Sequence, residues 1–243
     1  MSAIRIAMWS GPRNISTALM RSFGNRPDTF VSDEPLYAHY LAETGIEHPG
    51  RDEILEQCEI DWRAVVDELT GPVPGDRTIW YQKHMAQHLL PHIGRDWLDG
   101  LVHAFLIRDP GEMLRSLDKV MPDPGLSLTG LVQQVEIHRW CEETGGVAPP
   151  VVDTRDVLEH PEAMLRKLCE TLGIDFLGEM LAWPAGKRET DGVWAPHWYA
   201  AVERSTGFEP YRPKDEPLPG HLSDVYEQCL EPYGYLHERR LTP

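Results

Sequence analysis

Short runs of apolar residues recur along the chain, and each is followed by a polar residue or by a Gly/Pro break. Runs of nearly continuous apolar character are typical of strands that are buried on both faces of a parallel sheet. They lie at Ile4 to Trp9, Thr29 to Ser32, Thr78 to Gln82, Val102 to Ile107 and Pro150 to Val152. We therefore predict that these segments form one sheet.

Between these runs, apolar residues recur at helical spacing. One such pattern runs from Ile54 to Leu69 and another from Leu128 to Trp140. A helix is also predicted from Pro161 to Leu172, with proline in its first turn and Gly173 as its stop, and a last one from about Leu222 to Leu230. Alternating strands and helices predict a doubly wound α/β fold with a mainly parallel sheet, whose ligand lies at the carboxyl ends of the strands.

The segment from Trp183 to Gly220 differs from the rest, because it is rich in Pro, Gly, Trp and charged residues and shows little periodicity. Loops of this length in a compact domain are usually either functional or disordered. The aromatic cluster Trp194-Ala-Pro-His-Trp-Tyr199 argues against disorder. We expect an ordered loop region that closes over the edge of the sheet.

Length and charge limit the classes of function. The chain has 243 residues and no break in composition, so we predict a single domain, 1–243. Its 39 acidic and 23 basic residues give a formal net charge of −16, which opposes nonspecific attraction to nucleic acid or to an anionic membrane. We expect no nucleic-acid or membrane partner. An anionic ligand must then be held by a local cluster of donors.

The cysteines, histidines and apolar segments favour a soluble, cytoplasmic protein without a metal. The cysteines are far apart and form no C-x-x-C pair, so neither a disulfide framework nor a zinc site is expected. No segment approaches the roughly 18 apolar residues of a membrane span, and no long apolar run precedes the first strand. None of the 11 histidines has the spacing of H-E-x-x-H or a similar metal motif.

The first strand is followed at once by a Gly-Pro turn, a hydroxyl pair and an amphipathic helix. The first N–H groups of a helix lack partners within it, and an anion is their natural ligand. Gly11 would allow a close turn, Arg13 would add charge, and the hydroxyls of Ser16 and Thr17 would reach phosphate oxygens. The alternative is an ordinary strand-to-helix connection with a helix cap. The segment is not a Walker A loop, because the lysine and the second glycine of that motif are missing.

A second candidate phosphate site follows the fourth strand. Arg108 leaves this strand at the sheet edge, and Ser116 follows eight positions later on the next predicted helix. A guanidinium fork and a hydroxyl together suit a phosphate group. The alternative for Arg108 and Asp109 is a local ion pair at a helix start.

These segments together resemble the sulfotransferase family, which uses 3′-phosphoadenosine 5′-phosphosulfate (PAPS) as sulfuryl donor on a P-loop-like fold. Ser10-Gly-Pro-Arg-Asn-Ile-Ser-Thr17 is similar to the family's 5′-phosphosulfate loop, and Phe105-Leu-Ile-Arg108 with Ser116 to its 3′-phosphate motif. The segment Thr154 to Gly173 resembles the family's later helical segment, and Gly186 to Trp194 its cover loop. The resemblance implies a PAPS-binding set of Gly11, Pro12, Arg13, Asn14, Ile15, Ser16, Thr17, Arg108, Ser116, Lys187, Arg188 and Trp194, with no metal.

The chain departs from the family pattern in three places. Asn14-Ile15 stands where the family often has Ser-Gly, and Ala18 stands where some members carry an aromatic that stacks on adenine. Trp194 is followed by Ala195 instead of Lys. We therefore expect Lys187 or Arg188 to hold the 3′-phosphate from the cover loop.

Sulfuryl transfer needs a group that stabilises charge on the leaving phosphate and a base that takes the acceptor's proton. Arg13 is the candidate for the bridging oxygen. His84, which follows Lys83 at the end of the third strand, is one candidate base, and Lys83 is a further catalytic candidate, since some family members place a Lys and a catalytic His after a strand. Glu34, after the second strand, is its equal, with a capping role as the alternative. His88 and His103 are less suited, because they fall in a predicted helix and a strand.

The function expected from these features is a cytosolic sulfotransferase that moves a sulfuryl group from PAPS to a hydroxyl of a small acceptor. The acceptor site is expected between Leu36 to Tyr40, Leu126 to Trp140 and His197 to Tyr199, whose residues suit a partly apolar alcohol or phenol. Two alternatives stay open: a non-catalytic nucleotide-binding or regulatory protein, and a phosphotransferase. The sequence leaves the acceptor's identity and the oligomeric state open.

Overall fold

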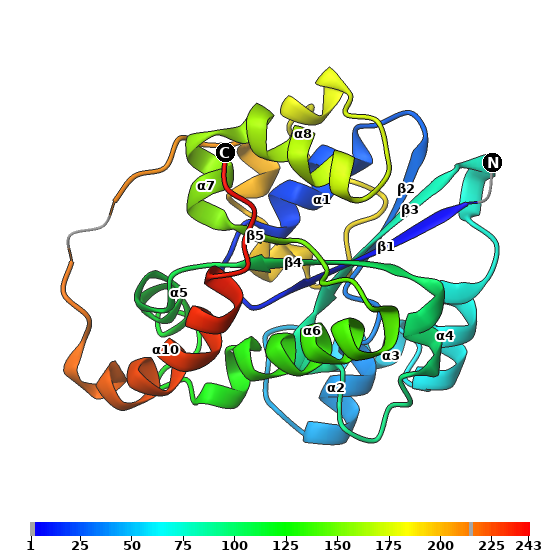
Figure 1. Ribbon diagram of the computed structural model, residues 1–243. Coiled ribbons are helices and arrows are strands. Elements are labelled where there is room, and N and C mark those ends of the chain that lie inside the picture. The colour runs from blue at the N-terminus through cyan, green and yellow to red at the C-terminus, as the bar shows by residue number, and fades with distance from the viewer. Residues whose placement is uncertain (1–2, 214–215) are drawn as a thin grey trace.

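The computed structural model describes residues 3–213 and 216–243. Its centre is a parallel five-stranded sheet with the strand order β2-β3-β1-β4-β5 (Figure 1). The predicted strands and the α/β fold class are confirmed. Their bounds are β1 Ile4–Ser10, β2 Thr29–Asp33, β3 Ile79–Met85, β4 Val102–Ile107 and β5 Val151–Asp153.

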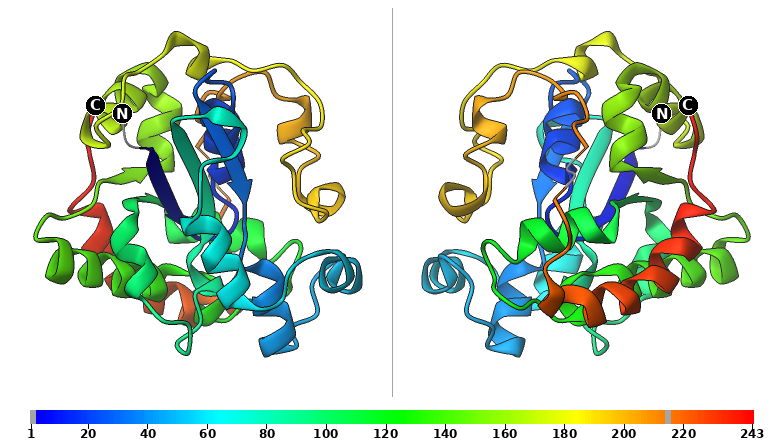
Figure 2. Two further views of the ribbon diagram at one scale, coloured as in Figure 1. Left: turned by 90° about the vertical axis from the view of Figure 1, so that its right-hand side faces the viewer. Right: turned by 90° about the vertical axis from the view of Figure 1, so that its left-hand side faces the viewer.

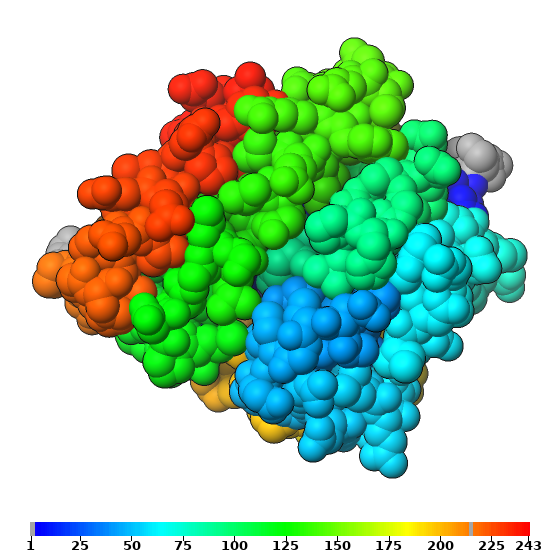
Figure 3. All heavy atoms as spheres, turned by 90° about the horizontal axis from the view of Figure 1, so that it is seen from below, coloured from blue at the N-terminus to red at the C-terminus, as the bar shows by residue number. Residues whose placement is uncertain are grey.

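Helices cover both faces of the sheet (Figure 2). On one face, α1 (Ser16–Gly24) and α8 (Pro161–Thr171) pack on the side chains of Ile6 and Met8. On the other, α4 (Trp62–Thr70), α6 (Leu131–Gly145) and α10 (Ser223–His237) pack on Ala7 and Trp9. Successive strand residues point to opposite faces, so each strand serves both cores. Figure 3 shows the second face from below, where the segments that carry α2 to α4, α6 and α10 cover the sheet.

The remaining α-helices are shorter than these. They are α2 (Tyr37–Thr44), α3 (Arg51–Gln57), α5 (Pro110–Leu117), α7 (Thr154–Glu159) and the single turn α9 (Ala195–Trp198). The long predicted loop region contains α9 and short 3₁₀ turns. In the part of it that the structure describes, it is otherwise irregular, and its residues 194–209 lie over the carboxyl ends of the strands.

Some predicted helix bounds were wrong for local reasons. The pattern from Ile54 to Leu69 is two helices, because the backbone is extended at Cys58 and the Asp61 side chain caps α4 by accepting from the Arg63 N–H at 3.0 Å. Helix α6 begins only after Gly130, which has a positive φ of 70°. Helix α8 ends before Gly173 (φ 71°), as predicted, whereas α10 continues to His237.

No helix in the described ranges is both long and apolar enough to cross a membrane.

Candidate functional site

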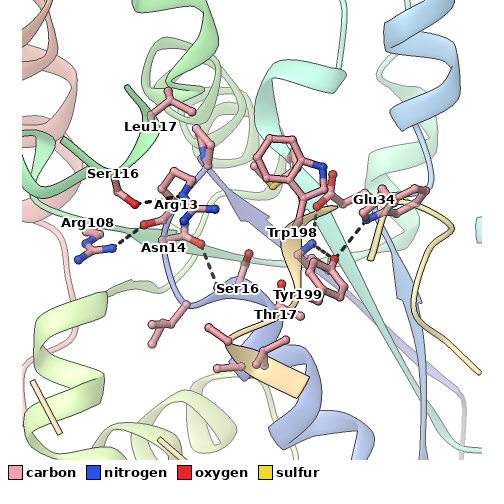
Figure 4. A pocket seen from close by; sticks show the side chains of 18 of the residues that line it. Arg13, Asn14, Ser16, Thr17, Glu34, Arg108, Ser116, Leu117, Trp198 and Tyr199 are labelled. Carbon is pink, nitrogen blue, oxygen red and sulfur yellow. Dashed lines mark hydrogen bonds and ion pairs between the residues drawn. The ribbon is translucent and has the colours of Figure 1, made fainter. Parts of the chain in front are cut away.

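A cavity of about 360 Å³ opens at the carboxyl ends of the strands. The loop after β1 and the start of α1 line one part of it, and the ends of β2 and β3 line another. Residues 194–209 supply part of the remaining wall. Figure 4 shows the labelled loop residues Arg13, Asn14 and Ser16 on one side of the site and Glu34, Trp198 and Tyr199 on the other.

The loop after β1 turns where only glycine fits. A Cβ on Gly11 would lie 2.4 Å from the carbonyl oxygen of Thr129, which is backbone and cannot move aside cheaply. The buried Gln134 holds the same point, with its amide oriented so that the oxygen accepts from the Gly11 N–H at 3.2 Å and the nitrogen donates to the Leu106 carbonyl at 3.1 Å. Gly11 therefore allows the loop to pack against the start of α6.

The start of α1 presents its first turn to the cavity. Asn14 Oδ1 accepts from the Ser16 N–H at 2.9 Å, and Ile15 occupies the cap position without a capping side chain. The amides of a first helical turn lack partners within the helix. The residues of this segment that line the cavity are Pro12, Arg13, Asn14, Ile15, Ser16, Thr17 and Ala18. Amides and hydroxyls of this kind suit an anion.

Arg13 joins the two predicted phosphate segments. Its Nε donates to Ser116 Oγ at 3.0 Å, and Arg108 Nη1 donates to the Arg13 carbonyl at 2.6 Å. The backbone of Arg13 has a φ of 57°, a left-handed conformation that costs a non-glycine residue about 1–2 kcal/mol. Burial and the neighbouring charge of Arg108 lower the pKa of the Arg13 guanidinium.

Glu112 orients Arg108. Its Oε2 accepts from Arg108 Nε at 3.0 Å and from Nη2 at 2.8 Å, and its Oε1 accepts from the Tyr211 hydroxyl at 2.5 Å. Burial opposes the charge on Glu112, but the bonds from Tyr211 and Arg108 outweigh it and lower the pKa of this carboxyl. Three of the five Arg108 N–H groups thus have partners, and the other two have none among residues 3–213 and 216–243, which leaves them to a ligand.

Lys83 lies at the other end of the cavity, is 1% exposed, and bonds three polar side chains through its ammonium. Its Nζ donates to Asp33 Oδ1 at 2.8 Å, to Glu34 Oε1 at 2.5 Å and to the Tyr199 hydroxyl at 2.9 Å. Burial opposes its charge, but Asp33 and Glu34 outweigh burial and hold the pKa of the ammonium well above its ordinary value. The Tyr199 hydroxyl in turn donates to Asp33, at 2.9 and 2.7 Å from its two oxygens.

Glu34 is the carboxylate of this group that faces the cavity. Its backbone has a φ of 42°, and its N–H donates to the Lys83 carbonyl at 2.9 Å, which fixes its position at the end of β2. Burial raises the pKa of its carboxyl, Lys83 opposes that rise, and the charge of Asp33 adds to it. In the described part of the chain, Lys83 bonds only to Oε1, and Oε2 has no partner.

The sequence matches the family described as "Sulfotransferase domain" over residues 4–238. The chain belongs to this sulfotransferase family. It is also 38% identical over 232 residues to the branched-chain-amino-acid aminotransferase-like protein 2 of Arabidopsis thaliana, and 41% identical over 235 residues to protein 1 of that name. Each match covers 95% of this chain but only 41% of the relative, so the chain spans less than half of these longer proteins.

Solved sulfotransferase domains share the fold. The domain from the Synechococcus PCC 7002 olefin synthase aligns with a TM-score of 0.56 at 15% identity and covers 93% of this chain and 94% of its own. The domain from the curacin biosynthetic pathway aligns with a TM-score of 0.58 at 13% identity, over 100% and 99%. A sulfotransferase from Alicyclobacillus acidocaldarius gives 0.54 at 12%, over 99% and 98%.

In this sulfotransferase domain, His84 lies away from the cavity, against the prediction that it is a candidate base. The third strand runs on to Met85, so alternation directs Lys83 to the α1 face and His84 to the opposite one. The His84 ring stacks on Trp9 at 4.5 Å and is 1% exposed. Burial, with a smaller effect of His103, lowers its pKa to about 3, so it is neutral and enclosed in the core.

The cover loop also differs from the prediction. Trp194 lines the cavity, whereas Lys187 is exposed and neither it nor Arg188 is among the lining residues. The cause is Asp191, whose carboxylate pairs with the buried Arg21 of α1 at 2.7 Å and accepts from the Arg188 N–H at 2.8 Å. This turn is held against α1, and the structure does not place a cover-loop cation at the phosphate segments.

Aromatic and histidine side chains complete the cavity beside Glu34. The Tyr37 hydroxyl is 2.7 Å from His48 Nδ1, and the Tyr37 ring stacks on His88 at 4.7 Å. Burial lowers the pKa of His48 and, with the charges of His48 and Lys83, places that of His88 well below its ordinary value. Trp198 closes this side (Figure 4). All three expected acceptor segments thus contribute to the lining of the cavity, through Tyr37, Leu128 and Trp198.

Sequence reasoning missed Asp33 as a member of the site, and it expected Tyr199 in an acceptor segment but not its contacts with Lys83 and Asp33. A signal for Asp33 exists, because it directly precedes Glu34 at the end of a strand. The contact of Tyr199 with Lys83 has no such signal, since the two residues are 116 positions apart in the chain. Within the described ranges, no three His, Cys, Asp or Glu side chains are grouped as a metal site.

Proposed function

We propose that the protein transfers a sulfuryl group from PAPS to the hydroxyl of a small, uncharged acceptor. The observation that carries this proposal is that one cavity contains both an anion-binding loop and a largely buried carboxylate, Glu34, one oxygen of which has no partner among the described residues. The loop suits the phosphosulfate of the donor, and Glu34 suits the proton of the acceptor. The family to which the chain belongs supports the same reaction.

The donor would be held by the phosphate segments. The amides of the α1 start, with the hydroxyls of Ser16 and Thr17, would bind the 5′-phosphosulfate. Arg108 and Ser116 would bind the 3′-phosphate, with Glu112 fixing the direction of the Arg108 guanidinium. Arg13, which already contacts Ser116, would face the bridging oxygen.

The chemical step is an in-line transfer. The acceptor oxygen forms a bond to sulfur while the bond from sulfur to the bridging oxygen breaks, and the electron pair of that bond stays on the departing 5′-phosphate. Arg13 and the loop amides stabilise this developing charge. Glu34 Oε2 takes the acceptor proton, and the raised pKa of Glu34 makes it a stronger base than an ordinary glutamate.

The charges around the cavity favour an uncharged acceptor. Three described cationic side chains line it, of which Arg13 and Arg108 belong to the phosphate segments. The third, Lys83, already bonds two carboxylates. His48 and His88 are held neutral by burial. A carboxylate on the acceptor would therefore find no free cation near Glu34 among the described residues, whereas the aromatic walls suit an alcohol or a phenol.

Ligand binding and transfer test the proposal in two steps. The product of the donor, 3′-phosphoadenosine 5′-phosphate (PAP), should raise the melting temperature, whereas ATP with magnesium should raise it much less. Labelled PAPS should then label a panel of small alcohols and phenols. Stabilisation by PAP without transfer to any of them would favour a regulatory nucleotide-binding protein, and a preference for ATP would favour a phosphotransferase.

A further inference from the structure

We propose that Tyr199 is a positioning residue. Its hydroxyl donates to Asp33, so that the Lys83 ammonium is shared between Asp33 and Glu34, and this keeps Glu34 Oε2 deprotonated and able to take the acceptor's proton. This inference rests on the proposed function for its consequence in turnover. It concerns a residue of the cover region, the loop region from Trp183 to Gly220, that the sequence analysis placed at the acceptor but gave no role in the chemistry. It also gives the cover region a role in chemistry, in addition to its role as a wall.

The geometry makes Tyr199 the centre of a closed set of hydrogen bonds. Its oxygen accepts from Lys83 Nζ at 2.9 Å, and its hydroxyl donates to Asp33. Trp194 Nε1 donates to the same oxygen at 3.3 Å. Tyr199 is 4% exposed, and its N–H donates to the Ala195 carbonyl at 2.8 Å, so the turn α9 fixes its position.

The Asp33 carboxylate accepts hydrogen bonds from three donors, and the Glu34 carboxylate accepts from one in the part of the chain that the structure describes. Asp33 accepts from Lys83, from the Tyr199 hydroxyl and from the Gly192 N–H at 3.1 Å. Glu34 accepts from Lys83 alone, in the described part of the chain. Because Gly192 and Tyr199 both belong to the cover region, that region supplies the donors that let Asp33 share Lys83 with its neighbour.

Removing the Tyr199 hydroxyl should disturb this sharing in a predictable direction. Asp33 would lose a donor and draw more on Lys83, and Glu34 would then experience more of the Asp33 charge with less compensation. The groups that face Glu34 are Asp33 on β2, Lys83 on β3, Tyr37 on α2 and Tyr199 itself. Only Lys83 among them is cationic, so a weaker interaction between Lys83 and Glu34 favours the protonated form of Glu34.

Titration of the Glu34 carboxyl carbon by ¹³C NMR in the free protein tests this without any turnover. The Glu34 signal is assigned by its absence in Glu34→Gln. In Tyr199→Phe the titration midpoint should rise by about half a pH unit or more, whereas Asp33→Asn should lower it, because the like charge is removed. Tyr40→Phe is the matched control, since Tyr40 is also 4% exposed but lies outside the cavity lining. In this variant the titration midpoint of Glu34 should equal that of the wild type.

Turnover and a double variant complete the design. The acid limb of the kcat profile should move to higher pH in Tyr199→Phe, while the KM for the acceptor changes little. In the Asp33→Asn background, Tyr199→Phe should have almost no further effect, because its action passes through the Asp33 charge. If Tyr199→Phe alone is too unstable to titrate, Asp33→Asn and the double variant are compared with each other, and a Glu34 midpoint that differs between them overturns the proposal.

The proposal is overturned if Tyr199→Phe leaves the Glu34 midpoint unchanged, if Tyr40→Phe shifts it equally, or if the double variant shows the full effect of Tyr199→Phe. These results are distinguishable from a failure of the proposed function. A wild-type protein that transfers no sulfuryl group contradicts the function, whereas the Glu34 titration still decides the role of Tyr199.

Discussion

Arg13 Nε and Ser116 Oγ are 3.0 Å apart, although 103 residues separate them in the chain. This hydrogen bond joins the loop after β1 to helix α5 and therefore brings the two phosphate segments into one site. The Arg108 guanidinium adds a second link, through the Arg13 carbonyl. The two ends of a 3′,5′-bisphosphate would thus be held by residues that also hold one another.

Arg108→Ala tests the 3′-phosphate assignment. It should weaken binding of PAP by about 1.5–3 kcal/mol, the scale of a hydrogen bond to a charged group. Adenosine 5′-phosphosulfate, which lacks the 3′-phosphate, should lose markedly less, and that smaller loss reflects the bond from Arg108 to the Arg13 carbonyl. Isothermal titration calorimetry with both ligands measures the difference, and equal losses would remove the assignment.

Glu34→Gln tests the base. It keeps the size of the side chain and should lower kcat by about 10²–10⁴, as expected for a lost general base, while PAP affinity changes little. His84→Phe is the comparison, because it keeps an aromatic ring against Trp9. Its turnover per folded molecule should be close to that of the wild type. Steady-state kinetics that show the opposite pattern would return the role to His84.

The buried histidines predict how stability depends on pH. Burial lowers the pKa of His84, His88 and His103 in the folded state, so below about pH 6.5 the unfolded chain binds protons that the folded chain does not. Stability should therefore fall as the pH drops, by up to about 1.4 kcal/mol per pH unit for each such histidine.

Urea unfolding between pH 7 and pH 5 measures this slope. His84→Phe should reduce it by the contribution of one histidine, because the pKa of about 3 leaves His84 unprotonated over this whole range. An unchanged slope in that variant would show that His84 is accessible to protons in the folded protein.

Acceptors with a common phenol ring test the charge preference of the cavity. 4-Hydroxyphenylacetate and the uncharged 4-hydroxyphenylacetamide share the ring and the linker and differ in the charge of the group away from the hydroxyl. The carboxylate of 4-hydroxyphenylacetate should reduce kcat/KM at least about tenfold relative to an uncharged phenol, since the one cation beside Glu34 among the described residues, Lys83, is already paired. Equal efficiency for the acid and for the uncharged phenol would contradict the proposed acceptor class.

The sheet, its flanking helices and the loop after β1 could be predicted from the sequence because their signals are local. Apolar runs mark the strands, and a Gly-Pro turn before a hydroxyl pair marks the loop. The placement of His84 could not be predicted in the same way. It depends on β3 continuing three residues beyond Gln82, since the alternation of side chains along the strand then decides which residue reaches the cavity.

The cover region shows the other limit of sequence reasoning. Its cations were expected at the donor, but the pair between Arg21 and Asp191, 170 residues apart, holds the turn away from the cavity. Tyr199 enters the site through a contact with Lys83, which is 116 residues away in the chain. Tertiary contacts of this kind leave no periodicity in the sequence. The extent of the chain as one domain stays a prediction.

Transfer of label from ³⁵S-labelled PAPS to an uncharged phenol tests the central claim most directly, when the wild-type protein is measured beside Glu34→Gln. The wild type should release PAP and form the labelled sulfate ester in equal amounts, and Glu34→Gln should bind the donor but form the ester about 10²–10⁴ times more slowly. A wild-type protein that binds PAPS and yields no labelled ester with any acceptor of the panel would contradict the claim.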